Sequence, residues 1–123
     1  MKQRKAFGKD VAAFQVLRHR IADYYTELEG VRQMTYHTCW LFENGEFAVK
    51  EASMAKLKAT ELLNTVVADC LQMHGGAGYI EDYLIARLFR DTKVGTIYGG
   101  TSEIMREIIA KTIIDDVNFK KVY

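Results

Sequence analysis

The chain has 123 residues, of which 49% are apolar and 27% charged, and its formal net charge is +1. This is the size of one domain with one core, and the balanced charge excludes a disordered tail or a basic nucleic-acid-binding surface. No apolar run approaches the ~18 residues of a membrane span, and the N-terminus lacks a signal-peptide pattern. We expect a protein of the cytoplasm, or of the mitochondrial matrix if the source is eukaryotic.

The first predicted element is a long helix over residues 10 to about 42. Apolar residues recur every three or four positions, which is the helical period, and no proline interrupts them. The series includes Ile21, Leu28 and Val31, which should lie on one buried face of the helix. The sequence ENG at 43–45 carries the turn signal that ends this helix.

A second long helix is predicted from about 47 to 73, and it should pair with the first as an antiparallel hairpin about Gly45. Three glycines within residues 75–78 should end this helix, because each costs roughly 1 kcal/mol inside a helix. A shorter helix is predicted to follow over about 82–92.

The fourth predicted helix starts at Thr101, whose side chain can cap the amides of the first turn. Its inner side should carry Ile104 and Met105. The expected fold is therefore all-α, an up-and-down four-helix bundle with two long antiparallel helices and two shorter ones.

The expected hairpin also decides what the two cysteines can do. Cys39 would lie opposite residues near 51 and Cys70 opposite residues near 20, so the thiols would be roughly 25 to 30 Å apart, far beyond the ~7 Å limit for a disulfide. The same separation removes a zinc site built from both cysteines with His37 and His74. We expect no metal site, and free thiols that pack in the core.

Polar groups and glycines should converge at one end of the bundle. The hairpin places Gln72 and His74 beside the start of the first helix, close to Phe14 and Gln15. One glycine would suffice to end a helix, so three suggest that another molecule approaches the backbone closely. A Rossmann dinucleotide site is rejected, because GGAGYIE follows a helix and lacks the third glycine at the required spacing.

Four sequence blocks resemble the C-terminal helical domain of the acyl-CoA dehydrogenase family. They are RKAFGKDVAAFQ at 4–15, QMHGGAGYIEDY at 72–83, RLFRDTKVGTIYGGTSEI at 87–104 and the closing IIAK. The blocks occur in the family's order and cover nearly the whole chain. The resemblance implies that residues 1–123 are this domain, with the N-terminal helical and middle β-barrel domains of complete members absent.

Members of this family oxidise an acyl-CoA to trans-2-enoyl-CoA, the α-proton going to a base and the β-hydride to FAD. The resemblance implies FAD as cofactor, an acyl-CoA substrate, an electron-transfer flavoprotein or similar acceptor, and a homodimer or homotetramer. The chain would supply FAD contacts and an oligomer interface, and by itself it should be inactive. The alternative is a non-catalytic helical oligomerisation or scaffold module derived from the same family.

The resemblance assigns FAD contacts to three segments. Arg4 would pair with the FAD pyrophosphate, which suits its planar charged fork. The remaining contacts of the first segment would be Lys5, Ala6, Phe14 and Gln15. The second segment, which would reach a neighbouring subunit's FAD, is Gln72, Met73, His74, Gly75 and Gly76. The third lies at a helix N-terminus, where free amides favour negative groups, and comprises Thr101, Ser102 and Glu103.

The sequence IYGGTSEI at 97–104 lacks an expected side chain. Gly99 stands where many members carry the glutamate that acts as catalytic base. Long-chain and isovaleryl-type members also lack it and take their base from an earlier helix, so we expect no catalytic residue in this chain. Gly100 would approach the substrate thioester. Without the resemblance, the two glycines are turn residues and Thr101 is a cap.

Overall fold

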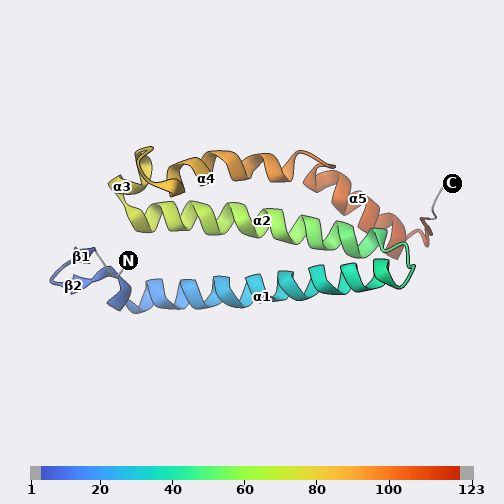
Figure 1. The fold of residues 1–123 in the computed structure, drawn as a ribbon, viewed down its shortest axis with the longest axis horizontal. Helices are drawn as coiled ribbons and strands as arrows, with labels where there is room; N and C mark the ends of the chain where they lie inside the picture. Colours follow the sequence, from blue (N-terminus) through green and yellow to red (C-terminus); the bar gives the residue numbers. More distant parts are fainter. Residues whose placement is uncertain (1–3, 120–123) are drawn as a thin grey trace.

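The computed structural model describes residues 4–119 and is largely helical. Two long helices, α1 (Gln15–Glu43) and α2 (Val49–His74), lie antiparallel (Figure 1). They are followed by the single turn α3 (Gly76–Tyr79) and by two shorter helices, α4 (Leu84–Thr92) and α5 (Ser102–Ile113). The expected all-α fold of two long and two shorter helices is confirmed.

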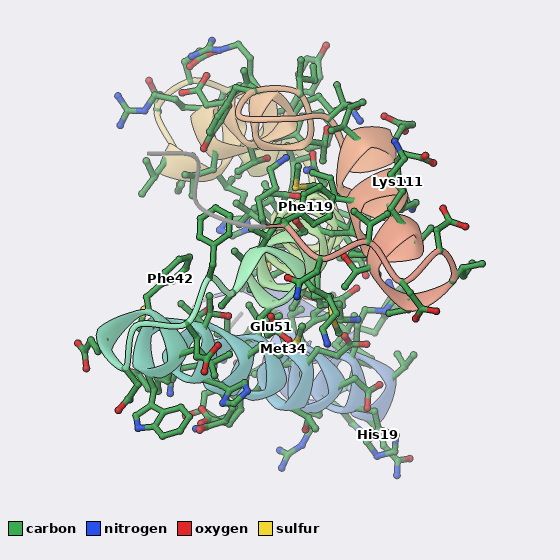
Figure 2. All side chains as sticks on the ribbon, turned by 90° about the vertical axis from the view of Figure 1, so that its right-hand side faces the viewer. His19, Met34, Phe42, Glu51, Lys111 and Phe119 are labelled. Carbon is green, nitrogen blue, oxygen red and sulfur yellow. The ribbon has the colours of Figure 1, made fainter. Side chains whose placement is uncertain are left out.

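Helix α2 is the central element of the molecule. α1 lies along one side of it, while α4 and α5 follow one another along the other side, both running opposite to α2 (Figure 1). The 3-10 helix η2 (Lys93–Thr96) and a turn join α4 to α5. Figure 2 shows Met34 and Glu51 where α1 and α2 face each other, and His19 and Lys111 pointing away from the bundle. Because every longer helix contacts α2, this helix positions both ends of the molecule.

Polar pairs between α1 and α2 fix the register of the two helices. The Tyr24 hydroxyl donates to the Asp69 carboxylate, and Arg20 pairs with the same carboxylate at 2.9 Å. Farther along, Lys58 pairs with Glu27. The register of 20 against 69 agrees with the prediction that residues near 20 lie opposite residue 70.

The N-terminal segment differs from the prediction. α1 begins at Gln15 instead of residue 10, because Lys5–Ala6 (β1) and Lys9–Asp10 (β2) form an antiparallel hairpin and Val11–Ala13 (η1) forms a 3-10 turn. At the hairpin tip, Phe7 and Gly8 have φ of 52° and 75°. Two successive positive φ angles are what a tight two-residue hairpin turn requires.

Several apolar residues expected in the core are exposed. Ile21 and Leu28 of α1 are 40% and 48% exposed, and Ile104 of α5 is 50% exposed, so the prediction of burial is wrong for them. By contrast, Val31 and Met105 are buried as predicted. Ile21 and Leu28 line an apolar groove of ≈ 460 Å³ between α1 and α2. No other element of the described chain covers this groove, which explains their exposure.

The two cysteines also differ from each other. Cys39 on α1 is exposed, so the prediction that it packs in the core is wrong, whereas Cys70 on α2 is half-buried. Both are free thiols. Burial, and then the charge of Asp69, raise the pKa of the Cys70 thiol.

Candidate functional site

The residues expected to contact a cofactor form two clusters at opposite ends of α2. We call the first the arginine end (residues 4–6, 14–15 and 72–76) and the second the glycine turn (residues 99–103). α2 touches the arginine end through His74 and the glycine turn through Lys56, 18 residues earlier (74 − 56). At ~1.5 Å rise per residue the two clusters are ~27 Å apart along the helix.

At the arginine end, Arg4 is anchored on the carbonyl group that ends α2. Its Nη1 donates to the His74 carbonyl oxygen at 2.6 Å. Its own carbonyl accepts from the Val11 amide at 2.8 Å, so the N-terminal hairpin carries this arginine. The predicted approach of the chain start to the end of the second helix is therefore present in the structure.

The glycines after α2 have different neighbours. Gly75 has φ 62° and ψ −147°, and a Cβ added there would lie 2.1 Å from Nη1 of Arg4. A Cβ at Gly78 would lie 2.7 Å from the Leu71 carbonyl oxygen, while one at Gly76 meets nothing within 4 Å. Two of the three glycines are thus required by the chain itself, and only Gly76 leaves its space open to another molecule.

A hollow of ≈ 330 Å³ opens beside Arg4. Of the predicted contacts, the residues that line it are Arg4, Ala6, Phe14, Gln72 and Met73. Lys5 and Gln15 are exposed and do not line it. The structure thus gathers five of the ten predicted residues of this end around one concave surface.

Two further lining residues, Arg20 and Asp69, were not predicted from the sequence. Asp69 also accepts the hydrogen bond of Tyr24, and this bond, followed by burial, raises the pKa of Tyr24 to about 12. The lining includes two arginines, Arg4 and Arg20, and a single carboxylate, that of Asp69, so the hollow carries a net positive charge. Such a charge suits a phosphate-bearing ligand. The predicted hairpin register already placed residue 20 beside residue 70, so pairing charges across it could have identified Arg20.

At the glycine turn, the backbone takes conformations that favour glycine. Gly99 and Gly100 have φ of 62° and 97°. A Cβ at Gly99 would meet nothing within 4 Å, so the space beside this residue is open, whereas one at Gly100 would lie 2.4 Å from Cε of Met105. Lys56 of α2 donates to the Gly100 carbonyl oxygen at 2.5 Å, a contact that the sequence did not reveal.

The predicted cap of the last helix is confirmed. The Thr101 hydroxyl accepts from the Ile104 amide at 3.3 Å at the start of α5. A hydrogen bond from its own amide, and then one from Thr101, lower the pKa of the Glu103 carboxyl. The first turn of α5 therefore carries both a cap and an ionised carboxylate, which complement the positive end of the helix dipole.

The glycine turn also presents unpaired hydrogen-bonding groups. Among residues 4–119, the amides of Gly99, Gly100 and Thr101 find no acceptor. Ser102 is only 3% exposed, and its Oγ has no hydrogen-bond partner within the described part of the chain. A buried polar atom without a partner is uncommon in proteins. Free donors at a helix N-terminus fit a ligand that brings an anionic or carbonyl oxygen.

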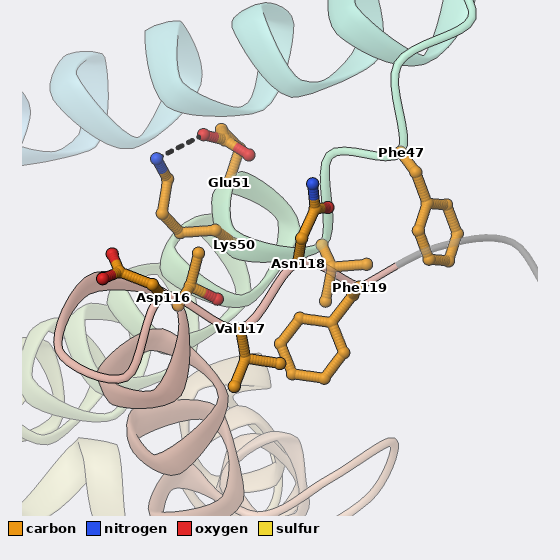
Figure 3. A pocket seen from close by; sticks show the side chains of 9 residues that line it. Phe47, Lys50, Glu51, Asp116, Val117, Asn118 and Phe119 are labelled. Carbon is orange, nitrogen blue, oxygen red and sulfur yellow. Dashed lines mark ion pairs between the residues drawn. The ribbon is translucent and has the colours of Figure 1, made fainter.

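A separate hollow of ≈ 280 Å³ lies where α2 begins and the chain leaves α5 (Figure 3). Phe47 and Phe119 flank it, and Lys50 and Glu51 pair across 3.1 Å. Burial would raise the pKa of Glu51, but its own amide and Lys50 outweigh burial and lower it. None of the predicted site residues lines this hollow, and its charged pair is already satisfied.

Two absences hold for residues 4–119. No three His, Cys, Asp or Glu side chains lie together in a way that could hold a metal ion. None of the helices there combines the length and apolar character that crossing a membrane demands.

Comparison with known proteins identifies similar domains in longer enzymes. Residues 1–114 match the family model of the acyl-CoA dehydrogenase C-terminal domain. The chain is 47% identical over 116 residues to the mitochondrial long-chain specific acyl-CoA dehydrogenase of Sus scrofa, across 94% of this chain and 27% of that protein. It is 43% identical over 113 residues to CarC, a subunit of the caffeyl-CoA reductase-Etf complex of Acetobacterium woodii, across 92% of this chain and 30% of that protein.

A solved structure shares the fold. The crystal structure of acyl-CoA dehydrogenase from Geobacillus kaustophilus superposes with a TM-score of 0.89 at 43% identity, across 92% of this chain and 30% of that one. The chain thus spans less than a third of the length of each of these three proteins.

Proposed function

This chain belongs to the acyl-CoA dehydrogenase family, as a C-terminal domain, and from that premise we propose that it is part of an FAD-dependent acyl-CoA dehydrogenase. In such an enzyme the chain works with an N-terminal helical domain and a β-barrel. When bound, FAD would supply the hydride acceptor for the β-carbon of the acyl-CoA, and removal of the α-proton by a base would complete the conversion to trans-2-enoyl-CoA. The fit of both clusters to an anionic cofactor carries the proposal.

The arginine end would hold the phosphate part of FAD. Arg4 offers a guanidinium fork that matches phosphate oxygens. Because its side chain is already held by the hydrogen bond to the His74 carbonyl oxygen, it would lose less conformational entropy on binding. Gln72 and Met73 line the same hollow. Gly76 leaves open space for close approach of the cofactor to the backbone.

The glycine turn would face the flavin and the thioester. The unpaired amide of Thr101 would meet an acceptor oxygen of the flavin. The Ser102 hydroxyl could do so only if its side chain turned outward, because its Oγ is buried in the structure. Gly100 would lie against the thioester, and the open space at Gly99 would admit a base from another part of the enzyme. This chain contributes no proton acceptor of its own to the reaction.

The two clusters would contact two different FAD molecules. In FAD a single ribityl chain joins the ring to the pyrophosphate, and it is much shorter than the ~27 Å that separates the clusters along α2. One chain therefore cannot hold both parts of one cofactor with these residues. Each FAD would combine the glycine turn of one subunit with the arginine end of another, and the enzyme would be a homodimer or a homotetramer.

The apolar groove between α1 and α2 would be covered in this assembly. Ile21, Leu28 and Leu63 are exposed along it, which is costly unless another surface packs there. The chain by itself should therefore self-associate. Sedimentation at high concentration checks this, and a homogeneous monomer of 14.1 kDa would contradict it.

The electron acceptor would be an electron-transfer flavoprotein. Similarity to CarC, a subunit of a reductase-Etf complex, supports this choice of partner. The mitochondrial relative supports the matrix as the compartment if the source is eukaryotic.

The test compares this chain with a complete enzyme that contains it. The chain alone should purify colourless and bring about no dehydrogenation, because holding the flavin ring would require a β-barrel domain in addition to these 123 residues. The complete enzyme should be yellow, and a panel of acyl-CoA chain lengths should bleach its flavin under anaerobic conditions. A complete protein that oligomerises but is colourless, or is not bleached by any acyl-CoA, would favour the scaffold alternative.

A further inference from the structure

One face of α2 contacts the connection between α4 and the glycine turn at three points. Lys56, Thr60 and Asn64 are spaced four residues apart and so lie on one stripe of the helix. Lys56 donates to the Gly100 carbonyl oxygen at 2.5 Å, and Nδ2 of Asn64 lies 3.4 Å from the Thr92 carbonyl oxygen. Between them, Thr60 packs so tightly on Gly95 that a Cβ there would be 3.3 Å from its methyl group.

We propose that Lys56 is a positioning residue for the glycine turn, an inference that rests on the proposed function. Thr60 and Asn64 hold the connection only as far as residue 95. Beyond it come Gly99 and Gly100, which have positive φ and no side chains to pack. Lys56 supplies the contact that fixes the second of these glycines, and its charge makes this hydrogen bond stronger than a neutral one.

The hydrogen bond to Gly100 determines the direction of the next amide. In a trans peptide the carbonyl oxygen and the following N–H point to opposite sides, and the chain contains no cis bond in its described part. Because Lys56 draws the Gly100 carbonyl toward α2, the Thr101 amide points away from α2. That amide is one of the unpaired donors that would meet the cofactor.

Loss of Lys56 would release this peptide plane. The peptide between Gly100 and Thr101 could then tilt through ψ of Gly100, which has no Cβ to restrict it, within the range that φ of Thr101 allows. The Thr101 amide would then point in a range of directions instead of one. The helix cap of Thr101 would remain, because its hydroxyl accepts from Ile104 independently of Lys56.

The test compares substitutions at two lysines of α2. Lys56→Met removes the donor, Lys56→Gln keeps an uncharged donor, and Lys56→Arg keeps the charge. Lys58→Met is the matched control, because Lys58 pairs with Glu27 on the opposite side of α2. The first measurement is amide hydrogen exchange in this chain, and the second is steady-state kinetics of a complete enzyme that contains it.

In Lys56→Met, we expect exchange of the Ile97 and Tyr98 amides, which donate to the Val94 carbonyl oxygen just before the glycine turn, to become roughly tenfold faster, corresponding to about 1.4 kcal/mol of lost protection. Amides of α1 should be unchanged. In the enzyme, kcat should fall roughly tenfold with a smaller change in KM, because the turn would contact the reacting part of the complex. Lys56→Arg should recover most of both effects and Lys56→Gln part of them.

The inference is overturned if the amide exchange rates and the kcat of Lys56→Met equal those of Lys58→Met. If Lys56→Met unfolds the chain, the same comparison can be made between Lys56→Gln and Lys58→Met. A complete enzyme that is inactive without any substitution would contradict the proposed function, while the exchange measurement would still decide whether Lys56 positions the turn.

Discussion

The arginine end and the glycine turn both offer hydrogen-bond donors to a ligand, but they are built from different parts of the chain. At the arginine end, long side chains surround a hollow, and the charge belongs to Arg4 and Arg20. At the glycine turn, the donors are backbone amides at the start of a helix, and a lysine of α2 holds the turn from the side of that helix. The first should therefore be sensitive to the loss of charged side chains, and the second to changes in backbone conformation.

The largest expected effect is at Arg4. In a complete enzyme, Arg4→Met should weaken FAD binding by roughly 10- to 100-fold, because a hydrogen bond to a charged group contributes about 1.5–3 kcal/mol. Arg4→Lys should lose less, since it keeps the charge without the fork. Fluorescence titration of the apoenzyme with FAD measures this, with Lys9→Met as the control on the same hairpin. Equal affinities for the two methionine variants would contradict the assignment of Arg4.

A second comparison uses a glycine from each cluster. Gly75→Ala should destabilise the chain by about 3 kcal/mol, because its φ and ψ are nearly exclusive to glycine and its Cβ would displace the Arg4 guanidinium. Gly99→Ala should cost about 1 kcal/mol, since its φ is also 62° but its Cβ enters open space. Urea unfolding of both variants measures the difference. A larger cost at Gly99 would show that the turn is the more rigid cluster.

The smallest expected effect concerns the hydrogen bond between Tyr24 and Asp69 beside the arginine end. The bond raises the pKa of Tyr24 from 10.0 to about 12, so it favours the neutral phenol in the folded state. Its stabilisation is fully present below pH 10 and is lost as the pH rises through about 12. Tyr24→Phe should therefore cost about 1 kcal/mol at pH 8. Urea midpoints of parent and variant should converge between pH 10 and 12, and a constant difference would exclude this bond as its source.

The sequence predicted the helices better than the surfaces between them. Apolar spacing identified α1 and α2, and Thr101 identified the start of α5, because period and caps are local properties. The hairpin at residues 5–10 was missed because Phe7, a non-glycine residue, adopts a positive φ at its tip. Ile21 and Leu28 were expected to be buried because periodicity finds an apolar face without revealing what covers it.

Site residues could be predicted from the sequence only where they belong to a family motif. The four blocks pointed to Arg4, Gln72 and the glycine turn, but the contact between Lys56 and Gly100 joins residues 44 positions apart. Such a pair has no local signature, since a lysine on a helix is ordinarily a solvated side chain. The separation of the clusters, too, follows from the length of α2 and not from any motif.

The central claim is that one FAD combines the arginine end of one subunit with the glycine turn of another. Its direct test is to co-express two variants of a complete enzyme, Arg4→Met, which damages the arginine end, and Gly100→Val, which distorts the glycine turn. Each alone should hold little FAD. In a mixed dimer, one of the two sites would join both intact clusters, so random pairing should restore bleaching by acyl-CoA at roughly a quarter of all sites. No restoration in verified mixed dimers would mean that each site is built within one chain, which would contradict a site shared between subunits.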